Sequence, residues 1–440
     1  MAGPILRRVH FLAPGVVLLA VAVRAPATAS AQVANGSTAA FAMGENYTAL
    51  AHGFDAVAWN PAGLGLRGTG RSSFAVLVVR GGTGIGPVTL GDLADWSNRL
   101  VPAGVKSEWL ARLGQESGES GSADADVTWL GVQIGRLAVH ASSSLRAEAA
   151  LAPGVAELIL FGNVGESGEA RALALGGSSG VATAHSAVGA SFAQPILLGG
   201  GGRIALGATV KYVVGHGMAV GDNSTGATTV DPLSVALDFP AVHTAGSSPD
   251  RGRGSGFGLD LGFGWDTPGG LSLGLAVRNV VSTFEWDADG LRFTPLAVRL
   301  DEDTAMTETG ELPFASAPGA LQRRVADLKF HPALAGGIAW RASPAWMVAG
   351  DVRITSDDGI RTGPARHIGG GLEFRPAPWL PLRAGVAAIS SGAGAGGWQA
   401  GVGFGFDLGA WNLAAGALLR DAGRLGAVTS FMVTLFGSGR

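Results

Sequence analysis

The chain contains no cysteine in 440 residues. We therefore expect no disulfide bond, no thiolate metal site and no lipoprotein anchor, because such an anchor requires a cysteine at the cleavage point. Lysine is almost absent, and none of Lys106, Lys211 and Lys329 follows a glycine as a phosphate-binding loop demands. The formal net charge of −3 gives no sign of a nucleic-acid partner. These absences predict a protein without a metal site or a cofactor.

Long apolar runs are also missing. Hydrophobic residues make up 47% of the chain and the mean hydropathy is +0.30, yet no apolar run beyond the first 31 residues could cross a bilayer as a helix. Only helices and closed barrels satisfy every backbone hydrogen bond in lipid, so the composition favours a β-barrel. A soluble glycine-rich sandwich or propeller is the alternative.

The N-terminus has the pattern of a secretory signal. Arg7 and Arg8 precede an apolar stretch over residues 11–23, and Ala-Ser-Ala at residues 29–31 is a small-x-small cleavage site. The pattern predicts export with a cleaved signal peptide and a mature N-terminus near Gln32.

Large apolar residues alternate strictly with glycine or charged residues in several segments, and this pattern indicates β-strands with an unusual second face. Residues 256–266 place five large apolar side chains on one face, while glycines, Asp260 and Asp266 occupy the other, and residues 398–408 repeat the pattern. A soluble sandwich would carry lysine, glutamate, threonine and serine on that second face. Glycine and isolated charge instead predict a crowded or ligand-holding interior, with the apolar face turned to lipid.

One stretch near the N-terminus, residues 43–66, combines a helical pattern with a built-in stop. Small apolar residues predict a helix over residues 47–57. Asn60 can then close a turn onto the backbone, Pro61 fixes φ without offering an N–H, and Gly63 tolerates a positive φ. The sequence therefore predicts a short helix that ends sharply.

The same stretch resembles the N-terminal signature of the FadL/PorV superfamily of bacterial outer-membrane β-barrels. That family includes uptake channels for fatty acids and hydrocarbons, and the PorV/PorQ accessory barrels of a secretion system. In the uptake channels the Asn-Pro-Ala element belongs to a hatch inside the barrel. The matching positions are Met43-Gly44, Tyr47-Thr48-Ala49 and Trp59-Asn60-Pro61-Ala62-Gly63-Leu64. The resemblance implies that the hatch or ligand residues are Tyr47, Trp59, Asn60, Pro61, Ala62 and Gly63.

With this resemblance we predict an all-β protein, a transmembrane antiparallel β-barrel of about 14 strands with short helical loop insertions. The signal peptide covers residues 1–31, the hatch residues 32–70 and the barrel residues 71–440. A closing strand is expected over residues 428–436. Tight turns such as 266–270 are expected at the periplasmic side. The expected extracellular loops or caps are residues 215–253 and 284–330, and the expected helices over the barrel mouth lie in residues 89–115.

Charged residues of both signs fall on the predicted inward faces. They are Arg203, Lys211, Asp260, Arg278, Asp351, Arg353, Glu373 and Asp407, together with Asp266, Arg341, Arg375 and Arg383. Two roles remain open for them. They form ladders that hold a plug or orient a carboxylate, or they solvate a wet interior.

The resemblance implies passive uptake of hydrophobic small molecules such as fatty acids across the bacterial outer membrane. The expected partners are outer-membrane lipid, lipopolysaccharide and a hydrophobic ligand. The alternative is a PorV/PorQ-like barrel that docks secreted proteins, because the form of the signature here is closer to that branch. A third class is a hydrolase based on Ser178 in a Gly-x-Ser-x-Gly match, but a strand rather than a helix is predicted after it, so we predict no enzyme.

Overall fold

A computed structural model of the protein describes residues 37–439 apart from short gaps. The gaps are 116–117, 170, 224, 231–232, 246–252, 302–304, 356–358, 361–362, 391–395, 410 and 422–426. The predicted signal peptide and its cleavage site lie outside the described residues. Among these residues, no helix is both long and apolar enough to span a membrane.

The described chain forms a closed antiparallel barrel of fourteen long strands. In order around the barrel they are β1 (Ser72–Gly86), β2 (Glu119–Ile134), β3 (Leu137–Leu151), β4 (Ser179–Leu197), β5 (Arg203–Asp222), β9 (Gly254–Asp266), β10 (Leu271–Ser282), β16 (Ala333–Arg341), β17 (Trp346–Thr355), β18 (Arg366–Ala377), β19 (Leu380–Ser390), β20 (Gly396–Leu408), β21 (Trp411–Asp421) and β22 (Ala427–Gly439). Each strand pairs with the next, and β22 pairs back onto β1. The predicted fold class and strand number are confirmed.

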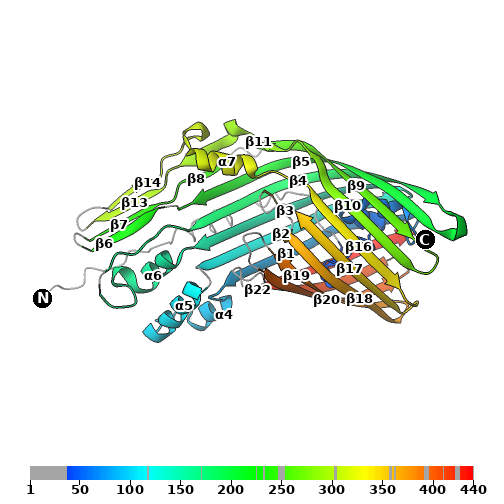
Figure 1. Ribbon diagram of the computed structural model, residues 1–440, viewed down its shortest axis with the longest axis horizontal. Coiled ribbons are helices and arrows are strands. Elements are labelled where there is room, and N and C mark those ends of the chain that lie inside the picture. The colour runs from blue at the N-terminus through cyan, green and yellow to red at the C-terminus, as the bar shows by residue number, and fades with distance from the viewer. Residues whose placement is uncertain are drawn as a thin grey trace.

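The two ends of the barrel differ in their connections (Figure 1). At the short-turn end, β9 and β10 are joined by only residues 267–270, and β2 and β3 by residues 135–136. The opposite, long-loop end carries four helices, which are α4 (Leu90–Asp95), α5 (Ala103–Gln115), α6 (Pro153–Phe161) and α7 (Gly319–Asp327). The helices predicted within residues 89–115 are therefore confirmed.

Short strands extend the wall at the long-loop end. β8 (Ala241–Thr244), β11 (Glu285–Trp286), β12 (Leu291–Thr294) and β15 (Leu312–Pro313) continue the barrel sheet. A separate four-stranded sheet contains β6 (Gly226–Val230), β7 (Leu233–Asp238), β13 (Ala297–Asp301) and β14 (Ala305–Glu308), and it stands off the barrel at this end (Figure 1). The loop that we expected over residues 215–253 therefore begins only after Asp222, because β5 runs on to that residue.

The exposed fractions of the side chains confirm the prediction that apolar residues face outward and that the residues between them face the interior. On β9, Phe257 and Leu261 are 59% and 43% exposed on the outer surface, whereas Asp260 between them is 3% exposed. Neighbouring strands repeat the scheme. The exposed outer side chains include Leu206, Val210, Ile338, Val348, Ile368, Val386 and Val402. The outside of the barrel is therefore an apolar belt, and its polar residues face inward.

Residues 37–66 of the predicted hatch (residues 32–70) lie inside the barrel, and nearly all of them are buried. We call residues 37–66 the hatch segment. Its helical turns are α2 (Thr38–Ala42), η1 (Gly53–Asp55), α3 (Ala56–Trp59) and η2 (Pro61–Gly65). The segment crosses the lumen, since α2 packs against β19 to β22 while η2 packs against β4, β5 and β9. The continuous helix predicted over residues 47–57 is wrong, because His52 is extended and Gly53 has a φ of +60°. These two residues break the helix into two short turns.

Candidate functional site

The wall around the hatch segment is built from glycine. A Cβ atom added to Gly385 would lie 2.0 Å from the carbonyl oxygen of Met43, and one added to Gly207 would lie 2.3 Å from the amide of Ala62. Other wall glycines in similarly close contact with the hatch are Gly262, Gly274, Gly337, Gly371, Gly401 and Gly403. The inward glycine face predicted from the sequence is therefore a seat for the hatch backbone.

Asn60 ties the hatch both to itself and to the wall. Its Oδ1 accepts a hydrogen bond from the amide of Ala62 at 3.1 Å, which is the predicted turn. Its Nδ2 donates to the carbonyl oxygens of Thr48 at 3.3 Å and of Phe263 on β9 at 3.0 Å. Gly63, in contrast, has no positive φ. Glycine is required there because a Cβ would lie 1.9 Å from the carbonyl oxygen of Ala51.

We expect Asn60→Ala to loosen the hatch, because it removes all three of these hydrogen bonds from a side chain that is 1% exposed. Unpaired buried polar groups cost about 1–3 kcal/mol each. Hydrogen exchange of the hatch amides should therefore rise at least about tenfold, the equivalent of ~1.4 kcal/mol. Asn60→Asp keeps the acceptor for Ala62 but turns a buried carboxylate oxygen towards two carbonyl oxygens, so it should loosen the hatch at least as much as alanine does. Wild-type exchange in Asn60→Ala would show that these bonds do not hold the hatch.

The remaining predicted hatch residues pack at the centre of the lumen. Tyr47 and Trp59 meet edge to face with ring centroids 5.9 Å apart, and both are about 5% exposed or less. The guanidinium group of Arg353 lies over the Trp59 ring, 5.0 Å from its centroid. Pro61 and Ala62 are buried against Gly207 and Gly262 of the wall. The six predicted residues are therefore brought together in one buried segment.

Two of the predicted lumen charges contact the hatch. Arg353 on β17 donates from Nη2 to Oε2 of Glu45 at 3.2 Å, and Asp351 on the same strand accepts a hydrogen bond from the amide of Thr48 at 2.7 Å. Sequence reasoning did not single out Glu45. A signal was available, because Glu45, His52 and Asp55 are the only titratable side chains besides Tyr47 in residues 37–66. A buried carboxylate in such an apolar segment requires a counter-ion.

Six of the other predicted lumen charges, Lys211, Asp260, Glu373, Arg375, Arg383 and Asp407, pair within the wall. Lys211 on β5 donates to Asp260 on β9 at 2.7 Å, and both side chains are buried. At the short-turn end, Glu373 bridges Arg375 and Arg383 at 2.8 Å, and Arg375 also contacts Asp407 at 2.6 Å. These are ion pairs between wall residues, and the two roles expected for the lumen charges, holding a plug or solvating a wet interior, stay predictions.

Among the described residues, no ion pair involves Arg203 or Arg278. Arg203 sits opposite Asp266 in the register of β5 and β9. Arg278 lines a small cavity together with Arg353 and His331. The predicted charges are therefore distributed along the whole lumen.

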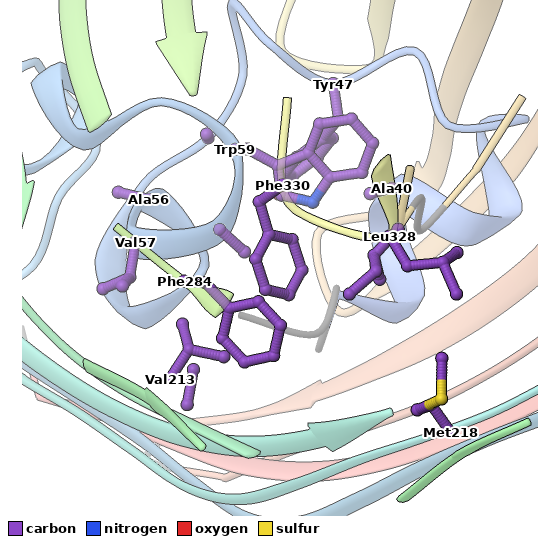
Figure 2. Close-up of a cluster of buried hydrophobic side chains, with 14 of the residues drawn as sticks. Ala40, Tyr47, Ala56, Val57, Trp59, Val213, Met218, Phe284, Leu328 and Phe330 are labelled. Carbon is purple, nitrogen blue, oxygen red and sulfur yellow. The ribbon is translucent and has the colours of Figure 1, made fainter. Parts of the chain in front are cut away.

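An apolar cluster closes the lumen between the hatch and the long-loop end. Phe284 and Phe330, at the two ends of the insertion between β10 and β16, meet with ring centroids 5.1 Å apart. Figure 2 shows both rings between Trp59 of the hatch and Val213 of β5, and all four residues belong to one buried cluster. The insertion, predicted as a loop or cap, thus sends its ends into the barrel. The indole nitrogen of Trp286 donates to the carbonyl oxygen of Leu328 at 2.8 Å and fixes this arrangement.

Below the hatch, towards the short-turn end, the lumen opens into a cavity of about 600 Å³. The hatch side chains Tyr47, Asp55 and Leu66 form part of its lining, and Arg341 and Arg383 line it from the wall. Along the barrel, the lumen therefore contains the apolar cluster, the hatch and then this cavity. A solute that crosses the barrel must displace the cluster and the hatch.

Helices α5 and α6 form a cap at the long-loop end with an apolar cluster of their own, whereas Leu321 and Val325 of α7 belong to the cluster beside the hatch. Arg112 of α5 contacts both carboxylate oxygens of Asp92 at 3.1 Å, and Asp92 closes a capping box with Thr89. These hydrogen bonds, led by the one from Arg112, lower the pKa of Asp92 to about 2. Trp109 and Leu113 of α5 are buried in one cluster with Val88 and with Ala156 of α6. The structural role predicted for residues 89–115 agrees with this packing.

Ser178 does not occupy a nucleophile elbow. It is 6% exposed, and its hydroxyl oxygen accepts a hydrogen bond from the amide of Ala152 at 3.0 Å. Strand β4 follows at Ser179, so the strand-to-helix turn that exposes a nucleophile is not formed here. Ser178 instead holds Ala152, the residue before α6, by this hydrogen bond.

Comparisons with known proteins agree with this architecture. The family model described as "F plasmid transfer operon, TraF, protein" matches residues 57–352, more than half of the chain. No curated protein matches the chain. The toluene transporter TbuX of Ralstonia pickettii has a TM-score of 0.50 at 14% identity, with 93% of this chain and 100% of that chain covered. A FadL homologue of Pseudomonas aeruginosa has a TM-score of 0.52 at 12% identity, with 94% and 100% covered. At these identities the likeness concerns the fold.

Proposed function

The chain belongs to the family described as F plasmid transfer operon, TraF, protein. From its barrel and the apolar cluster inside it, we propose that it is an outer-membrane channel for passive uptake of hydrophobic small molecules. The observation that carries the proposal is the apolar cluster that joins the hatch to the long-loop end inside a barrel with an apolar outer belt. Likeness of fold to a toluene transporter and a FadL homologue supports it.

The apolar belt supports the membrane location. Exposed Trp340, Trp346 and Trp411 lie near the short-turn end, where aromatic side chains commonly mark a membrane interface. The stacked pair of Trp346 and Phe374, with centroids 4.3 Å apart, adds to this girdle. In this proposal the short-turn end is periplasmic. The partners are outer-membrane lipid and, at the outer leaflet, lipopolysaccharide.

We expect Val402→Arg to lower the free energy of unfolding in a bilayer by about 2–4 kcal/mol, since a charge on the lipid face near the midplane has that cost. Val402 is 59% exposed near the middle of β20. Denaturant titration of the protein refolded in lipid vesicles measures the change. Val402→Leu is the matched control and should change stability little. An equal stability for the arginine and leucine variants would contradict a lipid-facing position.

The path of the ligand follows the apolar cluster. Phe284, Phe330 and Trp59 place three aromatic rings in succession above the hatch, while wall residues such as Val213 and Met218 are apolar at the same level. A hydrophobic molecule that replaces the Phe284 and Phe330 rings gains the same kind of contact that it removes. Movement of the hatch then opens a way into the cavity on the periplasmic side.

Native mass spectrometry of the detergent-purified protein, with extraction of bound lipid, tests this function. A co-purified fatty acid or hydrocarbon that is lost in Asn60→Ala supports uptake. Whole-cell uptake of labelled palmitate and toluene, in a Gram-negative host lacking its own channel for such compounds, measures transport. A protein that binds neither compound and gives uptake no faster than the empty host overturns the proposal.

A second candidate function is docking of secreted proteins, as in PorV/PorQ-like barrels. The four-stranded sheet of β6, β7, β13 and β14, which stands off the barrel at the long-loop end, offers a surface for a protein partner (Figure 1). The family description, which names a transfer operon, also favours a role in a larger assembly. An empty barrel that co-purifies with a secreted or periplasmic protein would support this candidate over uptake.

A further inference from the structure

Three arginines from distant strands converge on one carboxylate of the hatch. Arg80 on β1 donates to Oε1 of Glu45 at 3.2 Å, Arg353 on β17 donates to Oε2 at 3.2 Å, and Nη2 of Arg420 on β21 lies 3.7 Å from Oε2. The side chains of Arg80 and Glu45 are only 2% and 3% exposed. The hatch therefore places a single negative charge among three guanidinium groups in the wall.

The arginines have more donors than this carboxylate can accept. Arg80 Nε, Arg353 Nε and Arg420 Nη2 are all buried without a hydrogen-bond partner. Buried unpaired donors are rare in folded proteins, and each one requires an explanation such as a bound water or ion. The cluster therefore offers more hydrogen bonds to an anion than Glu45 now accepts.

The guanidinium groups are held in place without Glu45. Arg80 also lies 3.7 Å from Asp124 and 3.8 Å from Asp126 of β2. Arg353 contacts His367 at 3.0 Å, and Arg420 donates from Nε to Gln399 at 3.1 Å. The wall would keep the cluster assembled when the hatch moves.

Glu45 is, in contrast, held in an unfavourable backbone conformation. Its φ is +64°, in the left-handed region that costs a residue with a side chain about 1–2 kcal/mol. The preceding Gly44 has the same φ of +64°. The carboxylate reaches the arginines from a strained turn, and this strain favours its withdrawal.

We propose that Arg80, Arg353 and Arg420 form an anion-binding site in the barrel wall, which the Glu45 carboxylate occupies while the hatch is seated and a small monovalent anion fills when Glu45 withdraws. The Glu45 carboxylate is then the counter-ion of the three arginines while the hatch is seated, and an anion from solution replaces it when the hatch moves. Without Glu45 the same arginines give the lumen a positive constriction, and positive constrictions select anions. The site exists whichever molecule the barrel transports, so its test is independent of the uptake assay.

The direct test is Glu45→Gln, crystallised from bromide beside the wild type. We expect anomalous density for bromide among the three guanidinium groups of the variant, and none there in the wild type, whose carboxylate excludes the ion. Density in neither protein, or equally in both, overturns the proposal. Heat-dependent mobility in electrophoresis confirms that the variant barrel is folded.

Planar-bilayer recordings in a KCl gradient give a second readout. Glu45→Gln should show openings whose reversal potential shifts towards that of chloride, and the double variant Glu45→Gln with Arg353→Gln should lose most of this shift. Glu108→Gln is the matched control, because it removes a carboxylate that is 70% exposed on α5, and it should not shift the reversal potential. Cation-selective openings in Glu45→Gln would overturn the proposal.

Discussion

Replacing Gly385 with alanine is expected to unseat the hatch and convert a closed barrel into a conducting one. The new Cβ would lie 2.0 Å from the carbonyl oxygen and 2.2 Å from the carbonyl carbon of Met43. Both atoms belong to backbone, so the contact cannot be relieved by a rotamer change. Met43 is followed directly by the strained turn at Gly44 and Glu45. The hatch must therefore move as a unit, and the contact of Glu45 with its arginines should be lost with it.

The expected size of these effects in Gly385→Ala follows from the cost of overpacking a protein interior. Extra atoms in a well-packed interior cost about 1–3 kcal/mol, and backbone contacts leave the least room for relaxation. We expect hatch amides to exchange about tenfold faster or more, and ion conductance in planar bilayers to rise by a similar factor, since ~1.4 kcal/mol is tenfold in an equilibrium constant.

A glycine on the outer face provides the matched control. Gly350 on β17 meets no atom closer than 3.5 Å when a Cβ is added, so Gly350→Ala should leave conductance and exchange unchanged. If Gly385→Ala stays as closed as Gly350→Ala, the glycine seat does not determine the position of the hatch.

The barrel could be predicted from sequence because its signal is local. Alternation over residues 256–266 reports the two faces of one strand, and the glycine content of one face reports crowding there. Which glycine meets which hatch atom could not be predicted. That depends on the register of neighbouring strands, such as Gly385 opposite both Gly371 and Gly401.

The candidate site was predicted only in part, for the same reason. Asn60 closes its turn within two residues, so its local bond was predictable, whereas its bond to Phe263 joins positions 203 residues apart. The partners of Glu45 lie on β1, β17 and β21, and no short motif connects them. Phe284 and Phe330 were missed because they begin and end an insertion whose length and polarity indicate an external loop.

The aromatic rings at the ends of that insertion lead to the second large effect. We expect Phe330→Ala to increase uptake of a hydrophobic solute by about tenfold. Phe330 is 5% exposed and contacts Phe284 at 5.1 Å and His185 at 4.8 Å between ring centroids. Removing a buried phenylalanine ring typically costs about 3–5 kcal/mol of stability and leaves a cavity in an apolar site. A ligand that fills this cavity no longer has to displace the ring.

Stability and uptake must therefore change in opposite directions in Phe330→Ala. Whole-cell uptake of labelled toluene measures the increase, and thermal unfolding measures the loss of stability, which added ligand should partly restore because it binds only the folded barrel. Phe257→Ala removes the same ring from the outer face, where Phe257 is 59% exposed, and should leave uptake unchanged. A Phe330→Ala protein that is destabilised but transports no faster than Phe257→Ala would show that the aromatic cluster is structural packing and not the path of the ligand.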